Sequence, residues 1–221
     1  IGRSIICNRF RTHRRWWLLL YDDMKIIRIL MLILCEVGDV LSALIFALPG
    51  KSGSAIRYLW AKMFLKNCPS GVRFGRNIEI RSPKNITLNR KVKFDDYCFL
   101  DATKSSIIIY ANSSFNRNIQ INASSGGKIT IGENCIIGPG VIFRSANHNF
   151  YNPDVPIKNQ GHNSSDIIIE DDVWIGASAI ILPGVTIGKG CIVAAGSVVT
   201  KSFRAFQVIG GVPASIIKKR R

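Results

Sequence analysis

The sequence is poor in the residues that build most metal sites and hydrolase active sites. Its 221 residues include three histidines, and its six cysteines form no CxxC pair. This cysteine pattern argues against a zinc site and for buried, reduced thiols in a cytosolic compartment. No GxSxG or Ser-His-Asp pattern is present, so a hydrolase-type nucleophile is not indicated. Because no basic-aromatic RNA motif or recognition-helix pattern is present either, we expect no nucleic-acid partner.

Acidic residues are also scarce. Thirty Lys and Arg stand against fourteen Asp and Glu, which gives a formal net charge of +16. The positive excess lies in residues 1–129 and in the final residues 218–221, whereas residues 130–217 are nearly neutral. Two interpretations stay open: the charge provides solubility, or it attracts an anionic surface or ligand.

The longest hydrophobic stretch, residues 24–50, is interrupted by charges, which disfavours a simple membrane span. On a helical wheel the charges form a narrow polar stripe opposite a broad apolar face: Lys25, Arg28, Glu36 and Asp39. Residues 1–66 therefore predict an amphipathic, membrane-interfacial helical region, with a break at Pro49–Gly50 and a second helix over residues 53–66. Trp16 and Trp17 suit the headgroup level. Packing on the protein's own body and a true span are the alternatives.

From residue 72 onward, hydrophobic residues recur every six positions. The step lengthens only between groups, to 8, 9, 10 and 26 residues. The recurring positions are Phe74, Ile80, Leu88, Phe94, Leu100, Ile109, Phe115, Ile121, Ile131, Ile137, Phe143, Ile169, Ile175, Ile181, Ile187, Val193 and Val199. Three hexads therefore make one coil of a three-sided prism, about 18 residues long, with every insertion at the same corner.

Residues beside these positions predict the core and the corners. The residue two positions before each core position faces the same way, since side chains alternate along a strand. Three cysteines hold such positions and are predicted to fill the core rather than act as nucleophiles: Cys98, Cys135 and Cys191. A glycine directly follows four core positions, where we expect a tight corner with positive φ: Gly132, Gly138, Gly176 and Gly188.

The segments ITIGENCIIGPGVIF, IEDDVWIGASAIILPGVTIGKGCIVAAGSVVTK and VIGGVPASIIKK resemble the hexapeptide-repeat acyltransferases over about residues 72–219. The resemblance implies a mainly β fold, a left-handed parallel β-helix over residues 67–221 that follows the N-terminal α-helical region and acts as a homotrimer. The handedness comes from the resemblance, because parallel crossovers generally favour the right hand. The segment SANHNFYNPDVPIKNQG is similar to the O-acetyltransferases of sugars and surface polysaccharides, with maltose and galactoside acetyltransferases as relatives.

The excursion loop at residues 144–168 carries the expected catalytic base. A sugar hydroxyl is a poor nucleophile while protonated, so acetyl transfer needs a base. His148 matches the family's catalytic histidine, and His162 on the same loop is the competing base. His13 belongs to the basic N-terminal run and is expected to serve as a charge or a headgroup contact. Because three histidines cannot converge here, we expect no metal.

The resemblance also assigns binding residues. Trp174 precedes a core position, so it should point outward. In relatives this residue lines the active site between subunits, and here we expect it to pack on the acceptor sugar, with a plain subunit-interface role as the alternative. Gln120 and Asn122, about one coil before His148, are candidates for contacts that bind the acceptor or orient the histidine. Acetyl-CoA is the implied donor, lying in the groove between two subunits. Its pantetheine arm would pass two alanines, Ala177 and Ala195. Its phosphates would lie near three polar residues, Thr200, Lys201 and Lys218.

These expectations converge on an acetyl-CoA-dependent O-acetyltransferase. It would act on a lipid-linked surface-polysaccharide sugar at the cytoplasmic face of the cell membrane, with no acyl-enzyme intermediate. One alternative is an N-acyltransferase that acts on an amino sugar or nucleotide sugar. The other is a non-catalytic β-helix that scaffolds a membrane assembly.

Overall fold

The computed structural model describes residues 36–221 together with residues 27, 30, 32 and 33. The chain divides into two compact units, residues 1–44 and residues 45–221. In the first unit residues 36–44 are helical, and the side chains of Glu36 and Asp39 are exposed. Exposed apolar residues accompany them: Val37, Val40, Leu41 and Leu44. The other residues of the expected polar stripe, Lys25 and Arg28, lie outside the described residues, as do His13, Trp16 and Trp17.

Among the described residues, no helix combines the length and the apolar character needed to cross a membrane.

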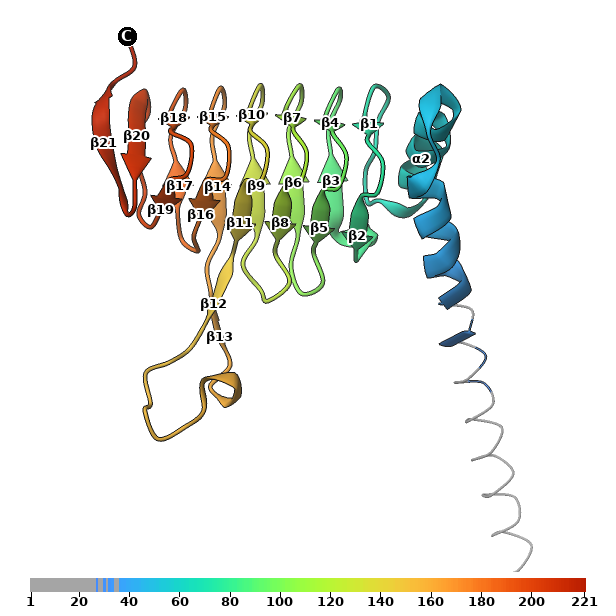
Figure 1. Ribbon diagram of the computed structural model, residues 1–221, viewed down its shortest axis with the longest axis horizontal. Helices are drawn as coiled ribbons and strands as arrows, with labels where there is room; N and C mark the ends of the chain where they lie inside the picture. The colour runs from blue at the N-terminus through green and yellow to red at the C-terminus, as the bar shows by residue number, and fades with distance from the viewer. Residues whose placement is uncertain (1–26, 28–29, 31, 34–35) are drawn as a thin grey trace, which may run out of the picture. The chain divides into compact units, whose positions relative to one another are not determined.

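In the second unit a short helical segment, residues 45–47, precedes helix α2 (Gly50–Phe64). The chain then continues as a β-helix with three faces, each a sheet of mainly parallel strands (Figure 1). The first face consists of β1 (Arg73–Phe74), β4 (Lys93–Phe94), β7 (Ser114–Phe115), β10 (Ile136–Ile137), β15 (Trp174–Ile175), β18 (Ile192–Val193), β20 (Gln207–Gly211) and the antiparallel β21 (Ala214–Lys219). The second face consists of β2 (Glu79–Arg81), β5 (Phe99–Asp101), β8 (Gln120–Asn122), β11 (Ile142–Arg144), β16 (Ile180–Ile181) and β19 (Val198–Val199). The third face consists of β3 (Ile86–Leu88), β6 (Ile107–Ile109), β9 (Ile129–Ile131), β14 (Ile167–Ile169) and β17 (Thr186–Ile187).

The order of the strands confirms the predicted coil. Consecutive strands pass from the first face to the second and the third, and the next strand returns to the first face one coil further on. Core positions pair in register between coils, for example Phe74 with Phe94 and Leu88 with Ile109. The insertions leave at the corner between the second and third faces, as predicted. They include the short helix η1 (Pro83–Asn85) and a long excursion with β12 (Ala146–His148), η2 (Ile157–Asn159) and β13 (His162–Ser164).

The expected reason for the glycines is wrong. None of Gly132, Gly138, Gly176 and Gly188 has a positive φ. Each lies instead against the backbone of the next coil: a Cβ on Gly132 would be 2.6 Å from the carbonyl carbon of Glu170, and one on Gly176 would be 2.6 Å from the amide nitrogen of Ala195. Positive φ occurs two residues further on, for example at Asn134 and Ser178. These glycines therefore permit close stacking of coils rather than the turn itself.

The inward-facing pairs form one continuous core. Residues two positions before the core positions are buried as predicted, including Val173, Ala179 and Val185. Aromatic rings continue along the first face: the ring centroids of Phe74 and Phe94 are 5.7 Å apart, and those of Phe94 and Phe115 are 4.6 Å apart. Apolar burial of this extent is the main stabilising contribution to such a solenoid.

The three predicted core cysteines are buried, which confirms their assignment as core filling: Cys98, Cys135 and Cys191. Burial raises the pKa of the Cys98 thiol, and likewise that of Cys135, to about 11. Burial also raises the pKa of the Cys191 thiol. A thiol that keeps its proton at neutral pH is a poor nucleophile.

Helix α2 covers the first coil with one narrow face. Its buried residues are spaced four apart, so they line one side of the helix: Gly53, Arg57 and Ala61. Just before this helix Phe46 is 3% exposed, and its ring meets that of Phe74 edge-on at 6.2 Å. The amide of Asn77 also donates to the carbonyl oxygen of Phe46 at 2.8 Å. Residues 45–66 therefore close the end of the core that the first coil would otherwise expose.

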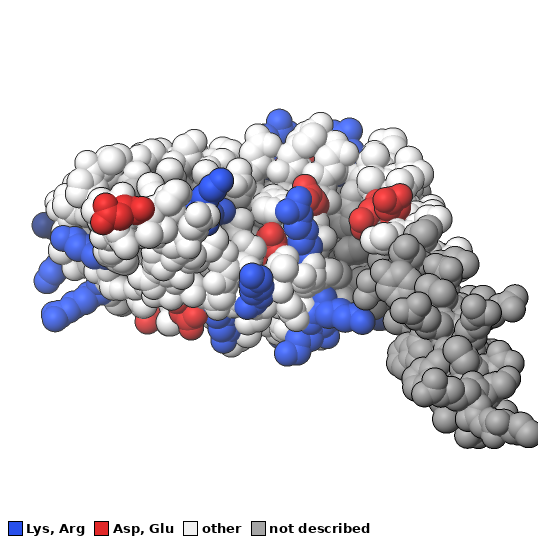
Figure 2. Space-filling view, turned by 90° about the horizontal axis from the view of Figure 1, so that it is seen from below, with Lys and Arg blue, Asp and Glu red and all other residues white. Residues whose placement is uncertain are grey.

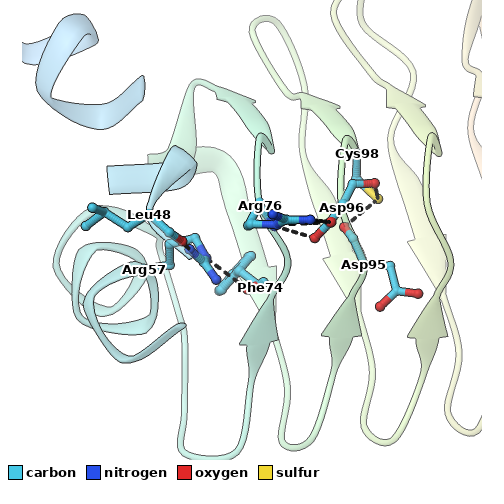
Figure 3. A network of polar contacts seen from close by, with 7 residues as sticks. All are labelled: Leu48, Arg57, Phe74, Arg76, Asp95, Asp96 and Cys98. Atoms are coloured by element: carbon cyan, nitrogen blue, oxygen red, sulfur yellow. Dashed lines mark hydrogen bonds and ion pairs between the residues drawn. The ribbon is translucent and has the colours of Figure 1, made fainter. Parts of the chain in front are cut away.

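The side chain of Arg57 joins this cap to the first coil. Its guanidinium is 3% exposed and donates from Nε to the carbonyl oxygen of Phe74 at 3.0 Å and from Nη1 to that of Leu48 at 2.5 Å (Figure 3). Burial lowers the pKa of Arg57, while the nearby Asp96 carboxylate opposes this shift. The charge is retained because two backbone acceptors take the place of water.

We expect Arg57→Met to lower the free energy of unfolding by about 2–4 kcal/mol, because a buried carbonyl oxygen, that of Phe74, and the partly buried one of Leu48 lose their donor. Lys51→Met, at an exposed position of the same helix, is the matched control and should change stability by less than about 0.5 kcal/mol. Urea unfolding followed by circular dichroism measures both. Equal effects of the two substitutions would show that the guanidinium does not hold the cap.

Stability should also fall at alkaline pH through the buried thiols. The folded protein holds the Cys98 proton to about pH 11, whereas the unfolded chain loses it near its ordinary pKa of 9.0. The unfolded state then binds fewer protons, so each such thiol lowers stability by about 1.4 kcal/mol per pH unit between these values. In Cys98→Ala the decline measured by urea unfolding should be shallower. Val92→Ala, at another fully buried position, should keep the wild-type slope, and equal slopes in both variants would refute this effect.

Candidate active site

The two histidines of the excursion loop lie directly opposite each other. Strands β12 and β13 pair antiparallel, and His148 is the register partner of His162. Their ring centroids are 4.2 Å apart with an angle of 38° between the planes, and both side chains are exposed. The candidate base and its competitor are therefore neighbours in one site, and sequence spacing alone gave no sign of this contact.

The loop beyond the two histidines is fixed by one side chain, which the sequence analysis missed. The amide group of Gln160 donates to the carbonyl oxygens of Asn152 at 2.8 Å and Val155 at 2.7 Å. Its Oε1 accepts a hydrogen bond from the Asn152 amide at 3.1 Å. The Asn149 side chain donates to the Gln160 carbonyl oxygen at 3.0 Å. A long surface loop with this internal bonding has a defined shape without a core of its own.

Gln120 and Asn122 lie on the strand next to the one that leads into the hairpin. Strand β8 pairs with β11, which places Asn122 beside Arg144, four residues before His148. The Asn122 amide oxygen accepts from both the hydroxyl and the backbone amide of Ser124, at 2.7 and 3.1 Å, whereas the Gln120 side chain is exposed. Within the described part of the chain, neither side chain hydrogen-bonds to His148. Both are neighbours of the hairpin, and their acceptor role stays a prediction.

Trp174 points outward from the first face, as predicted. Its side chain is 52% exposed, and it is in register with Ile136, which is 57% exposed, and with Ile192. These residues form an apolar strip on the outside of the sheet. His148 leaves from the corner between the other two faces, so one chain places Trp174 and His148 on different sides of the coil.

The expected donor residues fall into three places in one chain. Ala177 and Ala195 are stacked at the corner between the first and second faces, where the amide of Gly196 donates to the Ala177 carbonyl oxygen at 2.8 Å. Thr200 and Lys201 are exposed at the corner between the second and third faces. Lys218 lies on β21, paired with Val208. A single chain therefore keeps the two alanines, the Thr200–Lys201 pair and Lys218 apart from one another.

The described residues contain no group of three His, Cys, Asp or Glu side chains positioned to hold a metal ion.

A family model described as bacterial transferase hexapeptide (six repeats) matches residues 166–201. The chain is 31% identical over 172 residues to the "Putative lipopolysaccharide biosynthesis O-acetyl transferase WbbJ" of Escherichia coli (strain K12), which covers 73% of this chain and 84% of that protein. It is 35% identical over 109 residues to the chloramphenicol acetyltransferase of Agrobacterium fabrum (strain C58 / ATCC 33970), covering 42% of this chain. The chain spans about half of that second relative, 52% of its length.

Two kinds of solved structure share the fold. A hexapeptide-repeat-containing acetyltransferase from Vibrio cholerae O1 biovar eltor, VCA0836, complexed with acetyl coenzyme A, aligns with a TM-score of 0.57 at 24% identity, covering 81% of this chain and 84% of that chain. A point mutant of AntD, an N-acyltransferase from Bacillus cereus in complex with dTDP-4-amino-4,6-dideoxyglucose and coenzyme A, also gives 0.57 at 24% identity, covering 75% and 89%.

The triangular coil with its hexad register therefore matches the β-helix of these acyltransferases, including its expected left-handed form. Similarity to WbbJ extends over most of both chains. The chain belongs to the hexapeptide-repeat transferase family.

Proposed function

We propose that the protein is an acetyl-CoA-dependent O-acetyltransferase that modifies a sugar hydroxyl of a bacterial surface polysaccharide. The observation that carries the proposal is the exposed His148 on a hairpin that projects from an otherwise regular coil. An imidazole with access to solvent is a suitable general base near neutral pH. The likeness to WbbJ over 84% of that protein supports a polysaccharide hydroxyl as the acceptor.

In the proposed reaction, His148 accepts the proton of the acceptor hydroxyl while that oxygen attacks the thioester carbonyl of acetyl-CoA. The C–S bond then breaks, and the CoA sulfur leaves and takes up the proton from the imidazolium. The products are the acetyl ester and free CoA. Transfer is direct, without an acyl-enzyme, and the burial of Cys98 and Cys135 supports this because neither thiol is accessible or ionised.

The proposed donor site lies between two copies of the chain in a homotrimer. VCA0836 was determined with acetyl coenzyme A and AntD with coenzyme A, which supports a CoA thioester as donor. In one copy the proposed path of the pantetheine arm passes the corner with Ala177 and Ala195, whose side chains are single methyl groups. A second copy would add phosphate contacts from the exposed residues Thr200, Lys201 and Lys218. The exposed strip around Trp174 supports burial against a neighbouring chain or acceptor.

We further propose that residues 1–44 hold the enzyme on an anionic membrane surface at the cytoplasmic face, where a lipid-linked acceptor is confined. On the face shown in Figure 2, Lys and Arg side chains of the described residues are spread along the β-helix rather than gathered in one patch. The exposed apolar side chains of Val37, Val40 and Leu44 support an interfacial role for the first unit.

An N-acyltransferase is the second candidate, favoured by the fold shared with AntD, which was determined with an amino sugar nucleotide. Release of free thiol from acetyl-CoA, measured with two different acceptors, distinguishes the O-acetyltransferase from the N-acyltransferase. One acceptor is a preparation of oligosaccharides released from lipopolysaccharide by mild acid, and the other is an amino sugar nucleotide. A non-catalytic scaffold would bind acetyl-CoA without transferring acetyl groups to either acceptor.

His148→Ala should lower the rate of acetyl transfer by about two to four orders of magnitude, because the hydroxyl loses its base. Binding of CoA, measured by calorimetry, should persist, since the expected donor residues lie on the coils. His162→Ala is the matched control: it removes the facing ring but leaves the base, so its loss should be below about tenfold. A larger loss in His162→Ala than in His148→Ala would reverse the assignment.

Deletion of residues 1–44 should release the protein from vesicles that contain anionic lipid while leaving its β-helix folded. The cut precedes Phe46 and Arg57, so the cap of the core is retained. Vesicle sedimentation at low and high salt measures binding, and analytical ultracentrifugation of the truncated protein should still give a trimer. A truncated protein that pellets with vesicles as well as the full chain would assign membrane binding to the second unit.

A further inference from the structure

Two adjacent aromatic side chains in the excursion loop are displayed to solvent. Phe150 is 65% exposed and Tyr151 is 75% exposed. Their rings stack on each other, with centroids 5.2 Å apart and an angle of 27° between the planes. Exposed aromatic pairs of this kind, held outside any core, are typical of binding surfaces rather than of folding.

The backbone that carries the two rings is held in place. The three hydrogen bonds between the Gln160 side chain and residues 152 and 155 close the chain immediately after Tyr151. On the other side, the amide of Asn149 donates to the carbonyl oxygen of Gly161 at 3.0 Å. The pair is therefore fixed between two bonded segments, so a ligand would meet it with little loss of conformational entropy.

The hydrogen bond between Asn149 and Gly161 also places the two rings beside the candidate base. This hydrogen bond extends the β12–β13 ladder by one residue, to Asn149, and the side chains of His148 and Phe150 are exposed on either side of the half-buried Asn149. Residues two apart on an extended strand share a face and are about 7 Å apart along it. That distance is comparable with the width of one sugar ring. A group bonded to His148 would therefore have Phe150 beside it.

We propose that Phe150 and Tyr151 form an aromatic platform that binds the acceptor sugar ring next to His148. Sugars present apolar C–H faces that pack on aromatic rings while their hydroxyls bond at the edges. The donor is a poorer fit, because the adenine of CoA lies at the opposite end of the molecule from the reacting thioester. A base must contact the acceptor hydroxyl, so aromatic groups adjacent to the base meet the acceptor. The proposal rests on the proposed function.

The test measures steady-state acetyl transfer to oligosaccharides released from lipopolysaccharide by mild acid, with acetyl-CoA varied in parallel. Phe150→Ala and Tyr151→Ala should each raise the acceptor KM about three- to tenfold, the scale of one ring contact. The kcat and the KM for acetyl-CoA should stay within twofold, because uniform binding of the acceptor is lost. The conservative variants Phe150→Trp and Tyr151→Phe should restore the wild-type acceptor KM.

Tyr110→Ala, an exposed aromatic residue on the coil away from the loop, is the matched control and should leave all constants unchanged. A change confined to the acetyl-CoA KM would assign the rings to the donor and overturn the proposal. Loss of the trimer in Phe150→Ala or Tyr151→Ala would assign them to a subunit contact instead. If both alanine variants transfer acetyl groups at the wild-type rate with an unaltered acceptor KM, the aromatic platform is refuted and the proposed function stands. If the wild-type protein transfers no acetyl groups to this acceptor, the proposed function is refuted as well.

Discussion

The hydrogen-bonded spacing between successive coils, about 4.8 Å, is the constraint on which the rest of the structure depends. At this spacing the backbone of one coil leaves no room at the corners for a Cβ atom on the adjacent coil. Gly132 and Gly176 lie at such positions and have no Cβ atom. The turn itself is made two residues later by a residue with positive φ, such as Asn134 or Ser178. With both conditions met, the inward-facing pairs of each coil lie in register with those of the next coil and form a continuous apolar core.

A solenoid built in this way has two open ends, and each end is closed by a different device. At the N-terminal end, helix α2 and Phe46 cover the first coil, and Arg57 ties them to its backbone. At the C-terminal end, β21 folds back on β20, and Arg220 pairs with Asp172 at 2.8 Å and with the carbonyl oxygen of Gly190 at 3.0 Å. Terminal caps of this kind are needed because each repeat is stabilised mainly by its neighbours. For this reason residues 45–66 form part of the second unit, although the sequence predicted them as part of the interfacial region 1–66.

The sequence was most informative where the structure is periodic. The six-residue register predicted the coil, its three faces, the single corner of insertion, the outward Trp174 and the buried Cys98, because each follows from a repeated step. It was least informative inside residues 144–168, where no step repeats. The contact between His148 and His162 depends on a hairpin register, and the loop shape depends on hydrogen bonds from Gln160, and neither leaves a periodic signal. The reason for the glycines was missed because close approach between coils involves residues a whole coil apart in the sequence, such as Gly176 and Ala195.

The same contrast separates the regular coils, which carry the expected donor residues, from the excursion, which carries the proposed acceptor platform. The excursion leaves the coil after β11 and returns at β14, and its neck is closed by the Ser165 amide bonded to the Ser145 carbonyl oxygen at 2.9 Å. The coils on both sides keep their pairing, since Ile167 bonds directly back to Lys128 at 2.8 Å. The entropic cost of a closed loop grows only slowly with its length, so a long insertion at this neck disturbs the coil little. At a coil corner the backbone of Ala177 lies against the neighbouring coil, whereas the side chain of Phe150 in the loop is exposed to solvent. The proposed acceptor contacts can therefore differ among chains with the same coil, provided that the neck and the strand that carries His148 are kept.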